Sequence, residues 1–488
     1  MTVARWKLTD LLFAFVALLL FLVPAAINHS PILYPDSLGY FQAGKAATGA
    51  AHIRLPSEPA PAAQPGPAGK LGIDTSDGVS DARSVYYGAT FVLSWALAGL
   101  WALPVLQALL CVIAIYAALR HLAPDATRLQ RWAVVAGIGL FAGAGIFATT
   151  IMPDVFAGLL ILSITIFTIY RPSLSRFELV AWLALAVAAI LFHKSHLLIA
   201  GLMFCTIFAI GLVTRRRRWA SLAMIAMLIV VGGIGQAAFG IAARHAGLKV
   251  YSPPFLLARM IGDGTAEKYL RETCPQHRYA TCRFLPAMPM TENEFLWSGD
   301  GNPVGFATLS ASEKAEICDE QLPIVLGTLR SHGLEQISKS FVAVFRQIAS
   351  VGVTEYQVMP HDSAASALHR DLVAYADSGI ARRTMPLQLI SILMSACYFA
   401  GGAILLVMAF RVRHVPLRST TSPDPRRALA EAALLTVAAV LLNGAVCGAI
   451  SGVFDRYQGR VAWLIPLFAL AMLLQARRGP RIGTQAAA

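Results

Sequence analysis

The sequence predicts an all-α polytopic membrane protein. Hydrophobic residues occupy 57% of the 488 positions and charged residues only 14%, whereas soluble domains are about half apolar and about a quarter charged. The apolar residues form runs about as long as a bilayer core of ~30 Å requires. The net charge of +13 gives nucleic-acid binding little support, because basic residues cluster at the ends of these runs, where they set topology and meet anionic lipids.

We expect about ten transmembrane helices, at 8–27, 102–119, 132–150, 155–170, 179–192, 197–213, 222–243, 387–410, 428–450 and 461–474. An amphipathic segment, 85–97, leads into the second of them. The first run could also be a cleaved signal peptide, since small residues follow it at 23–26, but its length favours an uncleaved helix.

The basic residues agree with one orientation of these spans. With the N-terminus in the cytoplasm, the positive-inside rule is satisfied throughout. The residues that then fall on the cytoplasmic side are Arg120, Arg128, Arg131, Arg171, Arg176, the run 215–218, Arg411, Arg413, Arg426, Arg427, Arg477 and Arg478. We therefore expect an integral protein of a bacterial inner (plasma) membrane, with both termini cytoplasmic.

Three regions follow from this topology. Residues 1–243 form an N-terminal transmembrane module with a first outer loop at 28–88, residues 244–383 a small, mostly helical extracytoplasmic domain, and residues 384–488 the C-terminal transmembrane helices. Within the outer domain, 267–273 and 312–330 are expected helices, with a cap region near Ser312 and Glu316, and 337–348 has an apolar face at helical spacing. A Pro/Ala/Gly tract at 56–69 is typical of a flexible linker.

The seven cysteines divide between these regions. Four lie in apolar runs and are expected core residues, namely Cys111, Cys205, Cys397 and Cys447. Cys274, Cys282 and Cys318 lie in the long polar segment. If that segment is extracytoplasmic, Cys274 and Cys282 could form a disulfide; three cysteines leave one over, so the connectivity stays open.

The same topology brings polar residues from distant parts of the chain to the outer face. They are Asp36, Arg83, Asp154, His193, Lys194, His196, Arg456, Tyr457 and Arg460. Asp36 follows the first span in an aromatic-rich stretch, where a carboxylate could serve as a general base. The alternative is that Asp36 caps a short helix starting at Ser37; the cations expected on the same face favour catalysis.

Arg456 and Arg460 stand four residues apart, so they share one face of a helix. Guanidinium groups bind phosphate oxygens in a bidentate manner, so a phosphate at the membrane surface is the natural ligand. The alternative is that these arginines, with Tyr457, are ordinary interfacial residues. Their position on the outer face, where positive charge is disfavoured, favours binding.

The remaining candidates are more open. The polar segment 193–196 could bind phosphate, ligate a metal or simply form a turn. Asp154 follows Pro153 and could cap the next helix or take part in catalysis. Arg83 could complete a phosphate site or anchor the amphipathic segment. No Gly-rich phosphate loop, HExxH pattern or GxSxG elbow is present in the sequence.

Taken in order along the chain, these short motifs resemble the GT-C superfamily of integral-membrane glycosyltransferases, of the mannosyltransferase and aminoarabinose-transferase type. They are an acid in a D-x-x-x-Y context (Asp36 and Tyr40), an Arg-aromatic-Tyr helix (Arg83, Tyr86, Tyr87), a Pro-Asp pair (Pro153, Asp154) and an Arg-Tyr pair (Arg456, Tyr457). The resemblance covers the first half and the last two spans; the segment 244–383 is outside it.

The resemblance implies an inverting transfer of a sugar from a polyprenyl-phosphate carrier to a lipid, glycan or protein acceptor on the outer face. Carried over, Asp36 would be the general base, Arg456 and Arg460 would hold the carrier phosphate, and Lys194 or His196 would assist. Beside these we expect Asp154 as a further catalytic candidate, and Arg83, Tyr86 and Tyr457 as further candidates for binding substrate or phosphate. Such enzymes often carry two adjacent acids in the first loop, but Ser37 follows Asp36 here, which favours a reaction without a metal or other cofactor.

Two alternatives remain. A transporter or flippase for an anionic lipid-linked glycan needs polar residues at mid-membrane, and the spans carry few, chiefly Gln107, Gln236 and Asn443. A non-catalytic scaffold of the cell envelope would use the outer domain to dock a partner. The expected partners of the enzyme are the polyprenyl-phosphate sugar, the acceptor and membrane lipids, with no nucleic acid.

Overall fold

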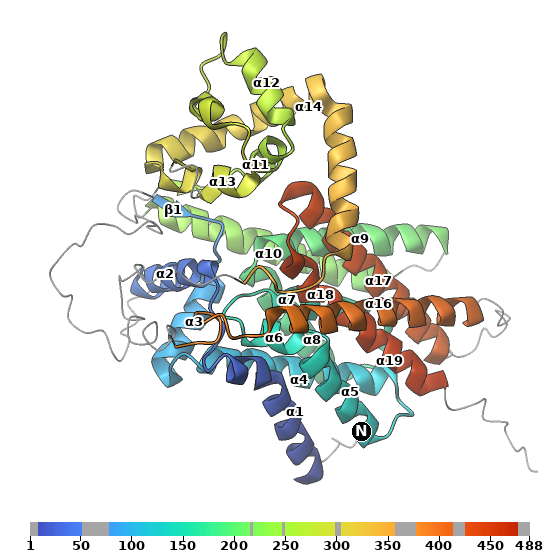
Figure 1. The fold of residues 1–488 in the computed structure, drawn as a ribbon. Helices are drawn as coiled ribbons and strands as arrows, with labels where there is room; N and C mark the ends of the chain where they lie inside the picture. The colour runs from blue at the N-terminus through green and yellow to red at the C-terminus, as the bar shows by residue number, and fades with distance from the viewer. Residues whose placement is uncertain are drawn as a thin grey trace, which may run out of the picture.

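The computed structural model describes residues 8–50, 78–214, 218–245, 249–297, 304–356, 377–412 and 425–476. It is an all-α structure: a large helical bundle carries a smaller helical domain at one end, at the top of Figure 1. Among the described residues, strand pairing is limited to two three-residue parallel strands, β1 (Gly78–Ser80) and β2 (Lys249–Tyr251), and one isolated parallel bridge between Ile32 and Thr150.

Fourteen described helices build the bundle. They are α1 (Leu8–Ile27), α2 (Pro35–Ala50), α3 (Val85–Ala98), α4 (Ala102–Leu122), α5 (Arg128–Phe141), α6 (Ala144–Thr149), α7 (Val155–Ile169), α8 (Arg176–Phe192), α9 (Lys194–Val213), α10 (Trp219–His245), α16 (Leu387–Val412), α17 (Pro425–Ile450), α18 (Asp455–Ala462) and α19 (Leu464–Ala476). Within the described part of the chain, seven helical stretches, counting α18 and α19 as one, are long and apolar enough to cross a membrane.

The expected spans that fall outside these seven are shorter helices. The expectation of one helix over 132–150 is wrong, because Gly143 adopts a left-handed conformation with φ of +96° and separates α5 from α6. α7 has 15 residues, and every one from Val155 to Thr168 is buried. A helix that is apolar on all sides belongs inside a bundle, so α7 lies at the centre of the fold.

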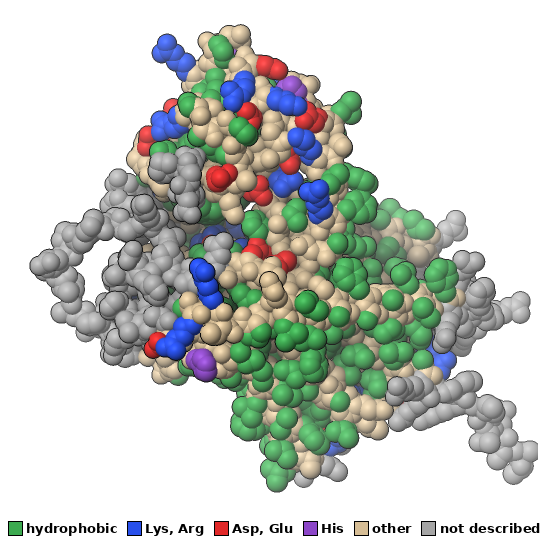
Figure 2. Space-filling view, viewed as in Figure 1, with side chains coloured by type: hydrophobic (Ala, Val, Ile, Leu, Met, Phe, Trp, Pro, Cys, Tyr) green, Lys and Arg blue, Asp and Glu red, His purple; other side chains and the backbone are tan. Residues whose placement is uncertain are grey.

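Figure 2 shows how the side chains divide between the two parts. Hydrophobic side chains cover much of the visible bundle, and Lys, Arg, Asp and Glu gather on the smaller domain. The exposed apolar residues include Leu19 of α1, Ile234 of α10 and Phe399 of α16. A soluble surface would not gather large apolar patches of this extent, so the bundle is the part that lipid covers.

The smaller domain has a core of its own. It is built from α11 (Phe255–Gly262), α12 (Thr265–Thr273), the 3₁₀ segments η2 (Ala280–Ala287) and η3 (Phe306–Thr308), α13 (Glu292–Trp297) and the first part of α14 (Ala311–Ala349). Leu257, Phe284, Phe295 and Ile317 are buried in this core. A disulfide joins Cys274 to Cys282.

α14 connects the two parts. The expected helices at 312–330 and 337–348 form one element, kinked at His332. The expected cap near Ser312 is wrong: Ser310 is the N-cap, and its hydroxyl and the Glu313 carboxylate form a reciprocal capping box. Beyond the kink, α14 runs down to the bundle (Figure 1) and packs on α17 so closely that a Cβ on Gly448 would lie 2.8 Å from the Ala343 carbonyl oxygen.

Two glycines bring α2 and α3 into backbone contact. A Cβ on Gly88 would lie 2.3 Å from the Tyr40 carbonyl oxygen and 2.6 Å from the Gly44 backbone nitrogen. These atoms belong to the backbone, so they cannot move aside as a flexible side chain would. The contact fixes the relative position of the first turns of α2 and α3, which contain or adjoin Asp36 and Arg83.

We expect Gly88→Ala to destabilise the protein by about 1–3 kcal/mol, the usual cost of overpacking, because the new methyl group overlaps the α2 backbone. Gly49→Ala is the matched control on α2, since a Cβ there has nothing within 4 Å. Thermal unfolding of the two detergent-purified variants measures the difference. Equal unfolding temperatures for Gly88→Ala and the unmodified protein would contradict the proposed contact.

Candidate functional site

The loop after α1 is tied to the loop before α7. The Ile32 N–H donates to the Thr149 carbonyl at 3.0 Å, and the Ile151 N–H donates to the Ile32 carbonyl at 2.8 Å. The Ser37 hydroxyl adds a bond to the Ile151 carbonyl at 2.8 Å. These bonds hold Asp36, in the first turn of α2, and Asp154, directly before α7, at the same end of the bundle.

The short helix α18 is held at the same place by α14 and α17. The Gln347 side chain donates to the Phe454 carbonyl at 2.7 Å and accepts from the Phe454 N–H at 3.0 Å. On the other side, the Asn443 amide donates to the Tyr457 carbonyl at 2.7 Å. These hydrogen bonds fix the orientation of α18, whose first turn contains Arg456.

Five charged residues meet where these elements converge, and we call them the acid–arginine cluster. Arg83 forms an ion pair with Asp36. The Arg456 guanidinium lies 3.7 Å from Asp36 Oδ2 and 3.4 Å from Asp154 Oδ2. Arg460 lies 3.2 Å from Asp154 Oδ1. Three cations thus face two carboxylates, and Arg456 bridges both acids although it is 420 positions from Asp36 along the chain (456 minus 36).

The cluster lies largely away from solvent. Asp154 and Arg460 are each 2% exposed and Arg456 is 7% exposed. Among the described residues, the Nε atoms of Arg456 and Arg460 have no hydrogen-bond partner. Buried guanidinium donors without acceptors are costly. With an excess of positive charge, such a cluster favours an anionic ligand.

Aromatic rings enclose Arg456. Its guanidinium carbon lies 4.3 Å from the ring centre of Tyr34 and 4.7 Å from that of Tyr457, within the range of cation–π attraction. Tyr34 also packs on Tyr356, whose hydroxyl lies 3.1 Å from the Thr150 hydroxyl. Burial raises the pKa of Tyr34 above its usual range, against the opposing effect of Arg456. Tyr34 therefore remains a neutral phenol beside the guanidinium.

The capping alternatives fit the structure poorly. α2 begins at Pro35, before Asp36, so Asp36 lies within its first turn rather than capping a helix from Ser37. The Asp154 side chain forms no capping hydrogen bond with α7; its oxygens lie against Arg456 and Arg460. Both acids are thus oriented by arginines.

The histidines lie behind the cluster. Arg460 contacts Asn443 Oδ1 at 3.1 Å and the Ser195 hydroxyl at 3.4 Å. That hydroxyl lies 2.8 Å from His193 Nδ1. Burial, followed by the charges of His196 and Arg460, lowers the pKa of His193 well below its usual value, so His193 is neutral. His196 is fully buried, with Nδ1 2.6 Å from the Ala189 carbonyl oxygen.

Two further candidates have their contacts outside the cluster. Lys194 forms an ion pair with Asp81, whose Oδ2 also accepts from the Ser252 hydroxyl at 2.6 Å. The Tyr86 hydroxyl donates to the Gly235 carbonyl at 2.9 Å and so ties α3 to α10. The structure thus brings Asp36, Arg83, Asp154, Arg456, Tyr457 and Arg460 together, and places Lys194, Tyr86 and His196 around them.

Glu355 is a candidate that the sequence analysis missed. It follows α14, and its Oε1 accepts from the backbone N–H of Arg456 at 2.9 Å. Burial, then a hydrogen bond with Asp455, raises the pKa of Glu355 to about 8. A carboxyl with such a pKa, next to Arg456, is suited to proton transfer near neutral pH. No apolar run or short motif marks Glu355 in the sequence. It reaches Arg456 only because the chain returns from the smaller domain to the bundle after α14.

In the part of the chain that the structure describes, no group of three or more His, Cys, Asp or Glu side chains is arranged to hold a metal ion. Comparisons with protein-family models, with curated proteins and with solved structures gave no match to this chain.

Glu355 makes stability depend on pH in a defined direction. Its folded-state pKa of about 8 lies above the ordinary value of 4.5, so between these values the folded protein holds a proton that the unfolded chain has released. The stabilisation from Glu355 is present below pH 4.5 and is lost as the pH rises through 8. Between about pH 5 and pH 8.5 the unfolding temperature of the unmodified protein should therefore fall. We expect the unfolding temperature of Glu355→Gln to fall less over the same range, because glutamine does not titrate.

The control is Glu316→Gln, which changes an exposed glutamate on α14 and should keep the pH profile of the unmodified protein. Unfolding temperatures measured in detergent at several pH values give the slopes. A slope for Glu355→Gln equal to that of the unmodified protein would show that Glu355 holds no such proton.

Proposed function

We propose that the protein is an inverting glycosyltransferase of the GT-C type, which moves a sugar from a polyprenyl-phosphate carrier to an acceptor hydroxyl at the outer face of a membrane. The observation that carries this proposal is the acid–arginine cluster. It lies at one end of a bundle with seven membrane-length stretches among its described residues, and Arg456 joins acids from two distant loops.

Arg83 and Arg456 are the proposed contacts for the carrier phosphate. Arg83 is the more open of the two, with 15% of its side chain exposed, and Arg456 has an unpaired Nε donor. Forked guanidinium donors match the oxygens of a phosphate. Arg460 is more deeply buried, and its donors contact Asp154 and Asn443, so we assign it to positioning Asp154 and α18.

Asp36 is the proposed general base. Its side chain is 22% exposed, and in the ligand-free structure its oxygens contact Arg83 and Arg456. A phosphate that binds these arginines competes for the same donors and leaves the Asp36 carboxylate facing the acceptor. Asp36 then takes the hydroxyl proton, the acceptor oxygen bonds to the anomeric carbon, and the carrier phosphate leaves with the electron pair of the broken C–O bond.

The outer location of the site is part of the proposal. The disulfide between Cys274 and Cys282 supports it, since such bonds persist in oxidising compartments. Asp10 and Arg128, at the start of α1 and of α5, form an ion pair at 2.9 Å. With the N-terminus cytoplasmic, this pair lies on the cytoplasmic side and the cluster on the opposite side.

The transporter alternative has less support from the described residues. Buried Gln107 accepts a bond from Tyr87 and donates to the carbonyls of Ala148 and Thr150. Asn443 is engaged by α18. Gln107 and Asn443 are thus satisfied within the protein and do not line a polar path through a membrane. Among the described residues Gln236 differs, since its Nε2 has no hydrogen-bond partner.

We expect Asp36→Asn to reduce sugar transfer by about 10²–10⁴-fold, the usual contribution of a general base, while the protein still inserts and folds. Asp10→Asn is the matched control, because it removes another arginine-paired carboxylate at the other end of α1. Mass spectrometry of the lipid-linked sugars and glycans formed in proteoliposomes measures transfer, and size-exclusion chromatography verifies folding.

Full transfer by folded Asp36→Asn would remove Asp36 as the base. If Glu355→Gln then abolished transfer, and the rate of the unmodified protein rose with pH through about 8, the base would be Glu355. Translocation of a lipid-linked glycan without any transfer would favour the transporter instead.

A further inference from the structure

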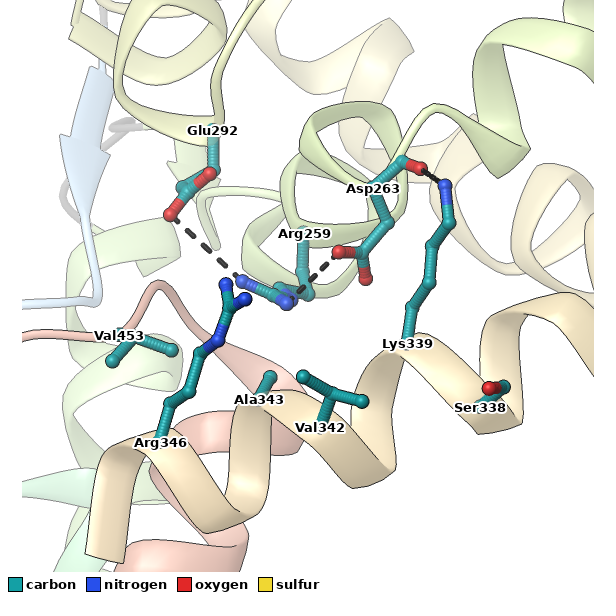
Figure 3. A pocket seen from close by; sticks show the side chains of 9 residues that line it. All are labelled: Arg259, Asp263, Glu292, Ser338, Lys339, Val342, Ala343, Arg346 and Val453. Atoms are coloured by element: carbon teal, nitrogen blue, oxygen red, sulfur yellow. Dashed lines mark hydrogen bonds and ion pairs between the residues drawn. The ribbon is translucent and has the colours of Figure 1, made fainter. Parts of the chain in front are cut away.

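A second polar pocket lies between the smaller domain and the bundle (Figure 3). Its volume is about 530 Å³, within the range of about 300–1,000 Å³ of small-molecule sites. The charged residues that line it come from three helices: Arg259 and Asp263 from the end of α11, Glu292 from α13, and Lys339 and Arg346 from α14. The transfer step proposed above uses none of them.

Arg259 is a buried cation whose hydrogen-bond donors are not all paired. It is 8% exposed. One of its terminal nitrogens pairs with Asp263 at 2.9 Å, but the other lies 3.9 Å from Glu292, too far for a hydrogen bond. Its Nε has no partner among the described residues. The two carboxylates compensate the charge of this guanidinium but leave its Nε donor without an acceptor.

Arg346 brings a second guanidinium to the pocket. Its exposed side chain extends from α14 toward Arg259 (Figure 3), and the described residues give it no hydrogen bond or ion pair. Lys339 is engaged with the Asp263 carbonyl and with Glu335. Lys339 is thus compensated by Glu335, and the other lining charges are Arg259, Arg346, Asp263 and Glu292. An oxyanion between Arg259 and Arg346 would accept hydrogen bonds from guanidinium donors that the described residues leave without an acceptor.

The pocket adjoins the acid–arginine cluster. Val453 lines it, and Arg456 is three positions further along the chain, so their Cα atoms lie at most about 11 Å apart. The adjoining face of α14 carries exposed Ile337, Phe341 and Phe345, spaced four residues apart and thus on one side of the helix. A basic pocket beside an exposed apolar helix face suits a ligand with an anionic head and a lipid tail.

We propose that this pocket binds an anionic group, phosphate or carboxylate, on the acceptor, with Arg259 and Arg346 as its ligands. The proposal rests on the function proposed above, because it treats the acceptor as the second substrate of the cluster. An acceptor held here by its charged group reaches the cluster along the short segment that leads into α18.

The test uses the full chain in phosphatidylcholine nanodiscs and the soluble probe glucose 6-phosphate, with glucose as the uncharged control. Isothermal titration should show binding of the phosphate sugar, weakened about tenfold or more by Arg346→Gln. Arg330→Gln is the matched control, since it removes an exposed arginine of α14 outside the pocket and should bind as the unmodified protein does.

A second arm identifies the source of the phosphate. Nanodiscs that contain phosphatidylglycerol are analysed by native mass spectrometry for retained lipid. If a lipid headgroup is the ligand, phosphatidylglycerol competes with glucose 6-phosphate, and Arg346→Gln retains less of it than Arg330→Gln. Dependence on Arg346 in either arm supports the pocket; equal binding by both variants in both arms overturns it.

Transfer assays separate this proposal from the function on which it rests. With the pocket engaged, Arg346→Gln raises KM for the acceptor and leaves kcat largely unchanged. If binding depends on Arg346 but the protein transfers no sugar, the glycosyltransferase proposal is wrong and the anion-site proposal is supported. If Arg346→Gln transfers sugar with an unchanged acceptor KM and binds the probes as the unmodified protein does, only the anion-site proposal is wrong.

Discussion

The contact of one guanidinium, that of Arg456, with two carboxylates organises one end of this bundle. Asp36 and Asp154 come from separate loops, and each would be costly to bury without a counter-charge. Arg456 lies 3.7 Å from one and 3.4 Å from the other. Three segments must therefore stay in fixed relative positions: the loop after α1, the loop before α7 and the start of α18. Most of the surrounding hydrogen bonds hold them there.

The scaffold of that geometry is largely backbone. Ile32 pairs with Thr149 and Ile151 between the two acidic loops, Gln347 clamps both polar groups of Phe454 before α18, and Gly88 lets α3 lie against α2. None of these contacts involves the reacting groups. Their effect is to hold charged side chains in place before a ligand arrives, which is the condition for electrostatic stabilisation of a transferring group.

The sequence predicts much of this arrangement. The remainder could not be predicted from it, for physical reasons. Long apolar runs predict α1, α10, α16 and α17 closely, since lipid dictates their length. The break at Gly143 is not evident, because a single glycine within an apolar run is also compatible with an unbroken helix. The positive-inside rule places Asp36 and Arg456 on one face, but their proximity depends on packing that only coordinates reveal.

Glu355 and the pocket at Arg259 lie beyond sequence reasoning for another reason. Both are formed where the smaller domain meets the bundle, by residues that are unremarkable in their own segments. The carboxyl of Glu355 is notable only because burial and a hydrogen bond with Asp455 raise its pKa, and Arg346 only because no described acid forms an ion pair with it. Such sites arise from the docking of one part of the chain on another.

The central claim is that Arg456 exchanges Asp36 for the phosphate of a lipid carrier. A cryo-electron-microscopy structure of the full chain in nanodiscs with a polyprenyl phosphate tests it directly. The account predicts phosphate density between Arg83 and Arg456, with the Asp36 carboxylate released toward the outer solvent. Density for the phosphate elsewhere, with Asp36 still paired to both arginines, would contradict it.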